Sequence, residues 1–222
     1  MNVIYPLAEK FISINGEGPK AGMMAAFLRM KGCNLSCNYC DTSWANESDC
    51  PTEPLNAREI LHWLKESGTV NVTLTGGEPL LIPHVSELIE ALGEAGFAVE
   101  IETNGSVPLA PFCELSHRPA FTMDYKCPDS GMEHYMRPDN FSLLTKDDSV
   151  KFVVSSENDL ARAEEITAGY HLTERCRVYL SAVFGRIEPR TITEYMIHHQ
   201  WNDVRLQLQM HKFIWPPQQR GV

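Results

Sequence analysis

The stretch A-A-F-L-R-M-K-G-C-N-L-S-C-N-Y-C, residues 25–40, predicts both the fold and the chemistry of this chain. Residues 25–30 form an apolar run of strand length, and three cysteines, Cys33, Cys37 and Cys40, follow it directly. Thiolates at this spacing suit an iron–sulfur cluster or zinc. A cubane cluster has four irons, so three cysteines leave one iron to a ligand that is not protein. An open coordination position is typical of a metal site that does chemistry.

Two simpler interpretations of the cysteine triplet stay open at this point. The three thiolates could belong to a zinc site that a distant histidine completes, and the chain has eight histidines. They could also be ordinary thiols in a reducing compartment. The other four cysteines are scattered along the chain and are expected to be reduced thiols without a shared role; they are Cys50, Cys113, Cys127 and Cys176.

Composition indicates a globular protein with a small-molecule substrate. The chain has 222 residues, of which 43% are hydrophobic and 22% charged, which suits one domain over residues 1–222. No apolar run approaches the ~20 residues that cross a bilayer. Residues 1–10 lack the features of an export signal, and an odd number of cysteines, seven, fits a reducing cytosol. We therefore expect a cytoplasmic protein without a membrane anchor.

The charge distribution argues against a nucleic-acid partner. The formal net charge is −10, and no run of lysine or arginine interrupts the sequence. Proteins that bind nucleic acid normally carry a basic patch that neutralises phosphates. A small molecule is the better candidate for a substrate.

Apolar runs of strand length alternate with segments of helical spacing, a pattern that predicts an α/β fold. Strands are predicted at residues 25–30, 70–74, 97–102, 120–124, 150–154, 177–182 and 204–209, with helices around residues 57–64, 85–92, 160–168 and 192–199. About six strand–helix units are too few for a closed eight-stranded barrel, so we expect an open partial (β/α)6-like parallel barrel. Residues 11–19, taken alone, could be a mobile glycine loop before the first strand, and residues 215–222 are expected as an irregular tail.

A second motif, Thr75-Gly76-Gly77-Glu78-Pro79, follows one of the predicted strands about 35 residues after Cys40. By itself it could be a glycine turn between a strand and a helix. Together with the cysteine loop it resembles the radical S-adenosylmethionine (SAM) superfamily. The resemblance implies a partial barrel, a 4Fe–4S cluster on the three cysteines and SAM at the fourth iron. It also implies that the glycine backbone and the glutamate charge hold the SAM ammonium.

Further SAM contacts follow from the same resemblance. Tyr39 occupies the position of an aromatic residue against the adenine, although it could equally be a core tyrosine. The segment Glu102-Thr103-Asn104-Gly105 matches a ribose-binding stretch, although it could be a solvent-exposed turn. The full set of implied SAM contacts is Tyr39, Asp41, Gly76, Gly77, Glu78, Glu102, Asn104, Asp124, Lys126 and Ser181.

Four segments narrow the resemblance to the 7-carboxy-7-deazaguanine synthase family over essentially the whole chain. They are F-I-S-I-N-G-E-G-P at residues 11–19, F-L-R at 27–29, Cys40-Asp41-Thr42, and the ending with H-K-F at 211–213 and R-G-V at 220–222. Two departures weaken individual contacts. Asn15 stands where many relatives carry glutamine, and Asp124-Tyr125-Lys126 stands where others have Ser-Pro-Lys.

The family resemblance implies a substrate site and a magnesium ion. Backbone contacts to substrate are expected at Ile14, Asn15 and Gly16. Arg29 would grip the substrate carboxylate, for which its planar fork is suited. The remaining implied substrate contacts are Thr75, at the pterin ring, with His211 and Val222 closing the pocket. Thr42 would offer an oxygen to Mg²⁺.

The implied reaction is that of a carbon–nitrogen lyase in queuosine and 7-deazapurine biosynthesis. A reduced cluster cleaves SAM, and the resulting 5′-deoxyadenosyl radical takes a hydrogen from 6-carboxy-5,6,7,8-tetrahydropterin. Ring contraction with loss of ammonia gives 7-carboxy-7-deazaguanine. No side chain is assigned as a general base. The resemblance also implies a flavodoxin- or ferredoxin-type reductant and a homodimer.

Two other functions remain possible from the sequence. A glycyl-radical-enzyme activase is another short radical SAM protein with this cysteine spacing. A non-catalytic metal-binding or electron-transfer protein belongs to a different class, and it would leave the glycine–glutamate motif and residues 102–105 without a purpose.

Overall fold

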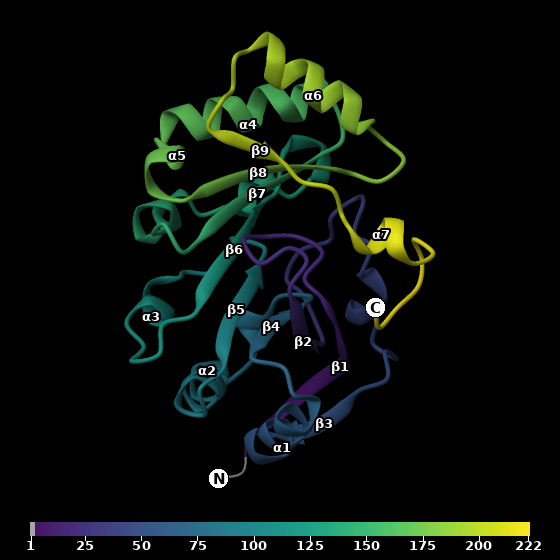
Figure 1. Ribbon diagram of the computed structural model, residues 1–222, viewed down its shortest axis with the longest axis vertical. Helices are drawn as coiled ribbons and strands as arrows, with labels where there is room; N and C mark the ends of the chain where they lie inside the picture. The colour runs from purple at the N-terminus through teal and green to yellow at the C-terminus, as the bar shows by residue number, and fades with distance from the viewer. Residues whose placement is uncertain (1–2) are drawn as a thin grey trace.

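One mixed β-sheet of nine strands runs through the molecule in the order β3-β1-β2-β4-β5-β6-β7-β8-β9 (Figure 1). The computed structural model describes residues 3–222. Residues 1 and 2 lie outside the described residues, and they begin the segment that is expected to lack an export signal. The strands are β1 (Ile4–Ile14), β2 (Met24–Met30), β3 (Glu53–Asn56), β4 (Asn71–Gly76), β5 (Ala98–Thr103), β6 (Ala120–Tyr125), β7 (Ser149–Val154), β8 (Arg177–Ala182) and β9 (Val204–Leu206).

Seven neighbouring strands, from β2 to β9, pair in parallel, and β1 is antiparallel to both β2 and β3. The two edge strands, β3 and β9, do not pair with each other, so the sheet stays open. This arrangement confirms the predicted open, mostly parallel α/β architecture.

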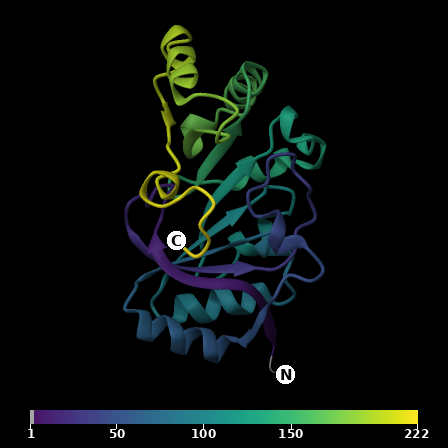
Figure 2. The same ribbon diagram turned by 90° about the vertical axis from the view of Figure 1, so that its right-hand side faces the viewer.

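Helices cover the sheet in two groups (Figures 1 and 2). The helices α1 and α2 lie at one end, and α4, α5 and α6 lie at the other. The bounds are α1 (Ala57–Ser67), α2 (Val85–Glu94), α3 (Ala110–Cys113), α4 (Glu157–Gly169), α5 (Leu172–Arg175), α6 (Pro189–His198) and α7 (His211–Ile214), with short 3₁₀ turns at η1 (Ser43–Asn46), η2 (Pro79–Leu81), η3 (Pro128–Ser130), η4 (Glu133–Tyr135) and η5 (Pro138–Leu143).

Local sequence explains where the first helix begins and ends. The Asn56 side chain accepts a hydrogen bond from the backbone N–H of Glu59, and the Glu59 side chain accepts one from the backbone of Asn56, which forms a capping box. Gly68 ends α1 in the left-handed conformation, with φ 67°. The helix therefore starts and stops where its cap residues stand.

Alternate side chains of the parallel strands meet two different environments. One set is apolar and packs against the helices as the core, with members such as Leu74, Ile101, Met123, Phe152 and Leu180. The other set is polar and forms what we call the interior face: Arg29, Thr73, Thr75, Glu100, Glu102, Thr122, Asp124, Ser149, Lys151 and Ser181. The interior face faces the loop that joins β1 to β2, because Thr73, Lys151 and Ser181 all bond to it. The apolar core thus lies between the sheet and the helices, and the polar side chains lie on the opposite face of the sheet.

Two expectations about the ends of the fold were wrong. Residues 25–30 are not the first strand, because β1 precedes β2 and pairs with it in the antiparallel direction, and β3 pairs with the other edge of β1. Residues 11–14, which alone could have been part of a glycine loop, belong to β1. In this strand only Tyr5 and Leu7 are buried, and it includes Pro6 and the charged Glu9 and Lys10, so its pattern resembles a loop. The strand expected at 204–209 ends at Leu206, and α7 forms just before the irregular tail.

Candidate active site

The sequence motifs gather where the parallel strands end. The cysteine loop follows β2, the glycine–glutamate motif ends β4, and residues 102–104 end β5. Asp124 and Lys126 lie at the end of β6, and Ser181 lies near the end of β8. Carboxyl ends of parallel strands meet at one edge of a sheet, which is where α/β proteins place their chemistry.

The three cysteines of the loop are free and half-buried. The Cys33 sulfur accepts hydrogen bonds from the backbone N–H of Leu35 and from Asn104 Nδ2, both at 3.4 Å. The Cys40 sulfur lies 3.6 Å from Thr42 Oγ1. Burial raises the pKa of the Cys33 thiol and raises that of Cys37 to about 11, although Lys126 partly opposes the second shift.

These thiols fit an iron–sulfur cluster better than a single metal ion. Within residues 3–222, no group of three or more His, Cys, Asp or Glu side chains is arranged to hold one metal ion. A single zinc ion needs its ligands to converge on one point, whereas a cubane spreads its thiolates over separate irons. Raised thiol pKa values also mean that a strong cation is needed to keep the cysteines as thiolates. Three thiols on one loop, with two N–H donors at Cys33, suit a cluster.

The two glycines of the second motif are required by the backbone of the cysteine loop. A Cβ on Gly77 would lie 2.0 Å from the carbonyl oxygen of Gly32, and one on Gly76, whose φ is +144°, would lie 2.3 Å from that of Met30. The amides of Gly77 and Glu78 donate to the Met30 and Gly32 carbonyls at 3.2 and 2.8 Å. The contact between the two loops is thus a reason for glycine at both positions, beside the expected contact with SAM.

Glu78 is fully buried and joins the end of β4 to the end of β5. Its carboxylate accepts hydrogen bonds from the Leu80 amide at 3.1 Å, the Thr103 hydroxyl at 2.9 Å and the Asn104 amide at 2.6 Å. Burial nevertheless raises the pKa of this carboxyl to about 7, against those hydrogen bonds. Both oxygens already have protein partners, so Glu78 supports the strand ends whatever else it contacts.

The Glu78 carboxyl predicts a pH dependence of stability. Its pKa rises from 4.5 in the unfolded chain to about 7 in the folded one, so between these values the folded chain holds a proton that the unfolded chain releases. The free energy of unfolding should therefore fall as the pH rises from 4.5 to 7, by about 3 kcal/mol from this group. Chemical denaturation across this range checks it. The Glu78→Gln variant cannot ionise at this position and should lose this slope, and an unchanged slope would contradict the assignment.

The expected SAM contacts near the cysteine loop are held by hydrogen bonds. Tyr39 donates its hydroxyl to the Val153 carbonyl at 3.1 Å, and the Arg186 guanidinium lies 5.7 Å from its ring centre. Asn104 is buried, and its Oδ1 accepts from the Ser106 amide at 2.9 Å, which turns Nδ2 toward Cys33. Glu102 lies half-buried on the interior face.

Four charged side chains alternate in sign across the interior face, and we call them the charged row: Lys126, Asp124, Lys151 and Glu17. Lys126 Nζ lies 2.7 Å from Asp124 Oδ2, and Lys151 Nζ lies 3.9 Å from the same oxygen. Lys151 Nζ also donates to Glu17 Oε2 at 3.1 Å, and Ser181 donates to Glu17 Oε1 at 3.1 Å. Sequence reasoning missed Lys151 and Glu17. A lone lysine in the apolar strand S-V-K-F-V-V was the available signal, because it marks a polar interior.

The expected substrate contacts surround the loop after β1. Asn15 is buried, its Oδ1 accepts from Thr73, and its Nδ2 has no hydrogen-bond partner. A Cβ on Gly16 would lie 2.9 Å from His211 Nδ1. Burial lowers the pKa of His211. The C-terminal segment thus packs directly on this loop, as the Gln207 side chain also shows by bonding the Gly18 backbone at 2.8 and 3.2 Å.

The other expected contacts lie around the same space. Arg29 Nε donates to Glu9 Oε1 at 2.7 Å, and Thr75 is buried beside it across the sheet. Ile14 ends β1, and Asp41 pairs with Lys212 at 3.4 Å. Val222 lies in the tail, whose Arg220 stacks 4.1 Å from the Trp44 ring centre and so reaches the segment after the cysteines.

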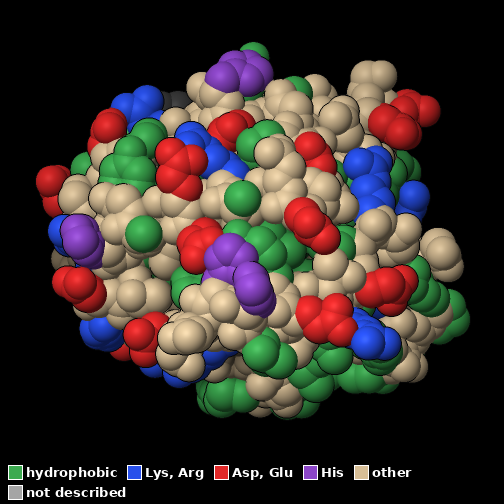
Figure 3. All heavy atoms as spheres, turned by 90° about the horizontal axis from the view of Figure 1, so that it is seen from above, with side chains coloured by type: hydrophobic (Ala, Val, Ile, Leu, Met, Phe, Trp, Pro, Cys, Tyr) green, Lys and Arg blue, Asp and Glu red, His purple; other side chains and the backbone are tan. Residues whose placement is uncertain are grey.

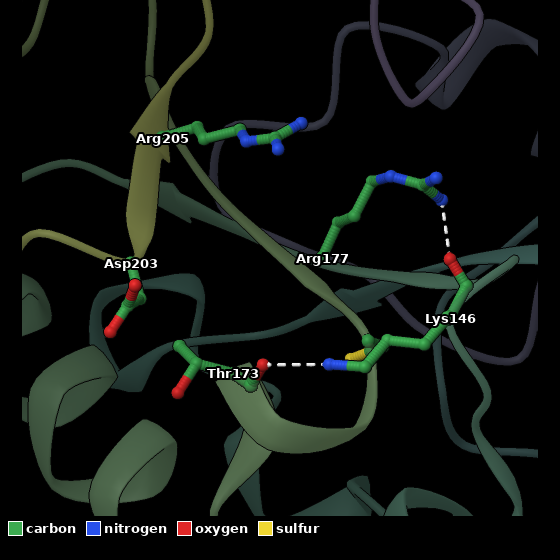
Figure 4. Close-up of a pocket in the computed structure, with 6 residues that line it drawn as sticks. Lys146, Thr173, Arg177, Asp203 and Arg205 are labelled. Carbon is green, nitrogen blue, oxygen red and sulfur yellow. Dashed lines mark hydrogen bonds between the residues drawn. The ribbon is translucent and has the colours of Figure 1, made fainter.

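Two cavities lie away from the cysteine loop. One, of about 390 Å³, is bounded by Phe184, Ile187, Gln207, Leu208 and Phe213. The other, of about 280 Å³, lies near the amino ends of β8 and β9 (Figure 4). There Lys146 Nζ donates to the Thr173 carbonyl at 3.1 Å, and Arg177 donates to the Lys146 carbonyl at 2.5 Å. Neither cavity includes a cysteine of the loop.

Two further features of the molecule are the charge on one face of its surface and the length of its apolar helices. On the face in Figure 3, Lys and Arg side chains are interspersed with Asp and Glu. On this face no extended patch of one sign is seen. Among residues 3–222, no helix is both long and apolar enough to cross a bilayer.

Comparison with known proteins yields one family model and a set of full-length relatives. The model of the radical SAM superfamily matches residues 27–124. The chain is 52% identical to a 7-carboxy-7-deazaguanine synthase of Clostridium acetobutylicum, over 98% of this chain and 99% of that protein. It is 36% identical to the 7-carboxy-7-deazaguanine synthase of Chlorobaculum tepidum, over 97% and 96% of the two chains.

Solved structures show the same fold at lower identity. QueE from Escherichia coli superposes with a TM-score of 0.73 and 23% identity, over 94% of this chain and 95% of that one. SuiB of Streptococcus suis, bound to its precursor peptide SuiA, gives a TM-score of 0.57 at 15% identity, over 82% of this chain and 47% of that one.

Proposed function

The chain belongs to the 7-carboxy-7-deazaguanine synthase family, and on that premise we propose that it converts 6-carboxy-5,6,7,8-tetrahydropterin into 7-carboxy-7-deazaguanine with loss of ammonia. It is a radical SAM enzyme of queuosine biosynthesis. The observation that carries the proposal is 52% identity over nearly the whole chain, together with a cysteine loop placed over a polar interior. Neither a glycyl-radical activase nor a non-catalytic metal protein accounts for that identity.

Cys33, Cys37 and Cys40 would hold the 4Fe–4S cluster. When bound, the cluster and SAM supply the radical that abstracts hydrogen from the substrate. The chain's own contribution is to bind, orient and exclude water from the reacting groups. The contact of Gly76 and Gly77 with the backbone of residues 30–32 fixes the cysteine loop against the strand ends.

SAM would lie over the ends of β4, β5 and β6. Asn104 bonds a cluster cysteine, and Lys126 offers an ammonium for the SAM carboxylate. The backbone at Gly76 and Gly77, with Glu78 behind it, would receive the SAM ammonium. The remaining proposed contacts are Tyr39, Asp41, Glu102 and Ser181, and Asp124 would act on SAM through Lys126.

The substrate would lie between the β1–β2 loop and β4. Asn15 Nδ2 is a buried donor without a partner, so an acceptor on the pterin ring would satisfy it. Ile14 and Gly16 would add backbone contacts, with Thr75 at the ring, His211 and Val222 at the rim. Thr42 Oγ1 would offer a hard oxygen to Mg²⁺ beside the cysteine loop.

Arg29 would hold the substrate carboxylate. Glu9 engages only its Nε, and within residues 3–222 no hydrogen bond or ion pair engages its Nη atoms. A guanidinium held on one side presents the other two nitrogens as a fork. Glu9 therefore orients the Arg29 guanidinium and leaves its two Nη atoms for the substrate carboxylate.

The Arg29→Lys variant tests this role. Lysine keeps the charge but loses the bidentate fork, so the KM for the carboxylated pterin should rise by about tenfold or more. Steady-state kinetics measure the change, and SAM affinity should stay the same. The Arg58→Lys variant, on the exposed side of α1, is the matched control. Equal KM values for Arg29→Lys and Arg58→Lys would contradict the contact.

We further propose the setting in which the enzyme works. It acts as a single domain over residues 1–222, as a homodimer in the cytoplasm, and it receives electrons from a flavodoxin- or ferredoxin-type protein. The negative charge of the chain and its mixed surface suit a small-molecule substrate.

Anaerobic turnover tests the function directly. The reconstituted protein is incubated with SAM, Mg²⁺, a reductant and 6-carboxy-5,6,7,8-tetrahydropterin, and mass spectrometry follows the pterin. We expect 7-carboxy-7-deazaguanine and one equivalent of ammonia for each pterin consumed. Formation of 5′-deoxyadenosine with the pterin unchanged would show a radical SAM enzyme with another substrate and would refute the proposal.

A further inference from the structure

Lys151 is the only member of the charged row that touches two carboxylates. Its Nζ lies 3.1 Å from Glu17 Oε2 and 3.9 Å from Asp124 Oδ2. Its side chain is 10% exposed, and that of Glu17 is 11% exposed. Charges this far from water are stable only when they are paired. Lys151 therefore balances both carboxylates at once.

The titration behaviour of the row agrees with this balance. Burial alone would lower the pKa of Lys151, but Glu17 and Asp124 outweigh it and raise that pKa. Burial alone would likewise raise the pKa of Glu17, and attraction to Lys151 lowers it. The Glu102 carboxylate also faces Lys151, and His211 also faces Glu17. Both partners are thus held in their charged forms.

Each carboxylate is tied to a different half of the active site. Glu17 belongs to the β1–β2 loop, whose residues 14–16 are the proposed substrate contacts. Asp124 holds Lys126 at 2.7 Å, and Lys126 is the proposed partner of the SAM carboxylate. The charge of Lys126 is also felt at Cys37. A change at Lys151 would reach the substrate side through Glu17 and the SAM side through Asp124.

Removing the Lys151 charge would leave two carboxylates and one ammonium in the row. Asp124 would then hold Lys126 without competition, so Lys126 would be less available to SAM. Glu17 would be a buried carboxylate with only the Ser181 hydroxyl, so its loop would shift toward water. The two consequences are separate, and each depends on one carboxylate.

We propose that Lys151 is a positioning residue that keeps Lys126 available to SAM and holds the substrate loop in place, an inference that rests on the proposed function. Lys151 does so without touching either ligand. Asp124 is one of the departures from the family pattern, since other members have serine there. Lys151 supplies the cation that this added carboxylate requires.

The Lys151→Met variant and two double variants test the proposal. In Lys151→Met, the dissociation constant for SAM and the KM for the pterin should each rise by about tenfold, the loss of one charge-assisted contact. Adding Asp124→Asn to Lys151→Met should restore the affinity for SAM but not the KM for the pterin. Adding Glu17→Gln should restore the KM but not SAM affinity. Lys146→Met, an exposed lysine on the loop before β7, is the matched control and should change neither.

The pattern of rescue decides between positioning and a general structural role. Wild-type values in Lys151→Met, or double variants that rescue neither ligand or both alike, would overturn the proposal. If Lys151→Met fails to fold, Lys151→Arg replaces it, and Asp124→Asn and Glu17→Gln are also measured as single variants. The two single carboxylate variants must then affect different ligands, Asp124→Asn the binding of SAM and Glu17→Gln the KM for the pterin. SAM affinity is measured by equilibrium binding without pterin, so that half of the test stands even if the pterin proves not to be the substrate.

Discussion

The Cys37→Ala variant is expected to lose 5′-deoxyadenosine and 7-carboxy-7-deazaguanine formation entirely, within detection. Cys37 is the middle cysteine of the loop, and its thiol has a pKa of about 11 because burial disfavours the thiolate. Only a bound cluster would hold it ionised. With two thiolates left, the cubane loses a second corner and no longer assembles stably. Iron and sulfide content after anaerobic reconstitution, followed by the turnover assay, measures both losses.

The Cys113→Ala variant is the matched control for this experiment. Cys113 is also a half-buried free thiol with a pKa raised by burial, but it lies in α3 away from the loop. Its iron content and turnover should equal those of the unmodified protein. Turnover retained without Cys37, or lost without Cys113, would refute the assignment of the cluster ligands.

Among substitutions near the site that add one methyl group, Gly77→Ala should reduce cluster content, turnover and stability the most. The added Cβ would lie 2.0 Å from the Gly32 carbonyl oxygen, which is backbone and cannot rotate away. The cysteine loop or the end of β4 must shift, so cluster content and turnover should fall by about tenfold or more, and stability by about 1–3 kcal/mol. Iron analysis and chemical denaturation measure the two effects.

Gly169→Ala controls for the substitution itself. This glycine ends α4, and a Cβ there meets nothing within 4 Å. Alanine favours helix over glycine, so stability should stay equal or increase slightly. If Gly77→Ala behaves like Gly169→Ala, the two loops do not touch as the structure shows.

Local patterns account for what the sequence predicted well. Apolar runs of strand length that alternate with segments of helical spacing predicted the parallel strands, because both patterns depend only on residues that are close together along the chain. The spacing of Cys33, Cys37 and Cys40 predicted the cluster loop for the same reason. The antiparallel strands β1 and β3 were missed because β1 mixes Pro6 and charged residues with its few buried positions.

Long-range pairing accounts for what the sequence could not predict. Lys151 and Glu17 are 134 residues apart, and although Glu17 lies in the segment of residues 11–19, nothing there points to a lysine so far along the chain. Gly77 was predicted for its contact with SAM, whereas its contact with the backbone 45 residues earlier, at Gly32, could be found only from the fold. Motifs identify a site, whereas the contacts that hold it require the fold.

The account rests on a cluster with one iron left for SAM above a polar interior. The most direct test is the electron paramagnetic resonance spectrum of the reduced, reconstituted protein before and after SAM is added. Three protein ligands predict a cluster signal that changes on addition of SAM, because SAM occupies the fourth iron. A cluster signal that SAM leaves unchanged, or a protein that binds zinc and gives no signal, would contradict it.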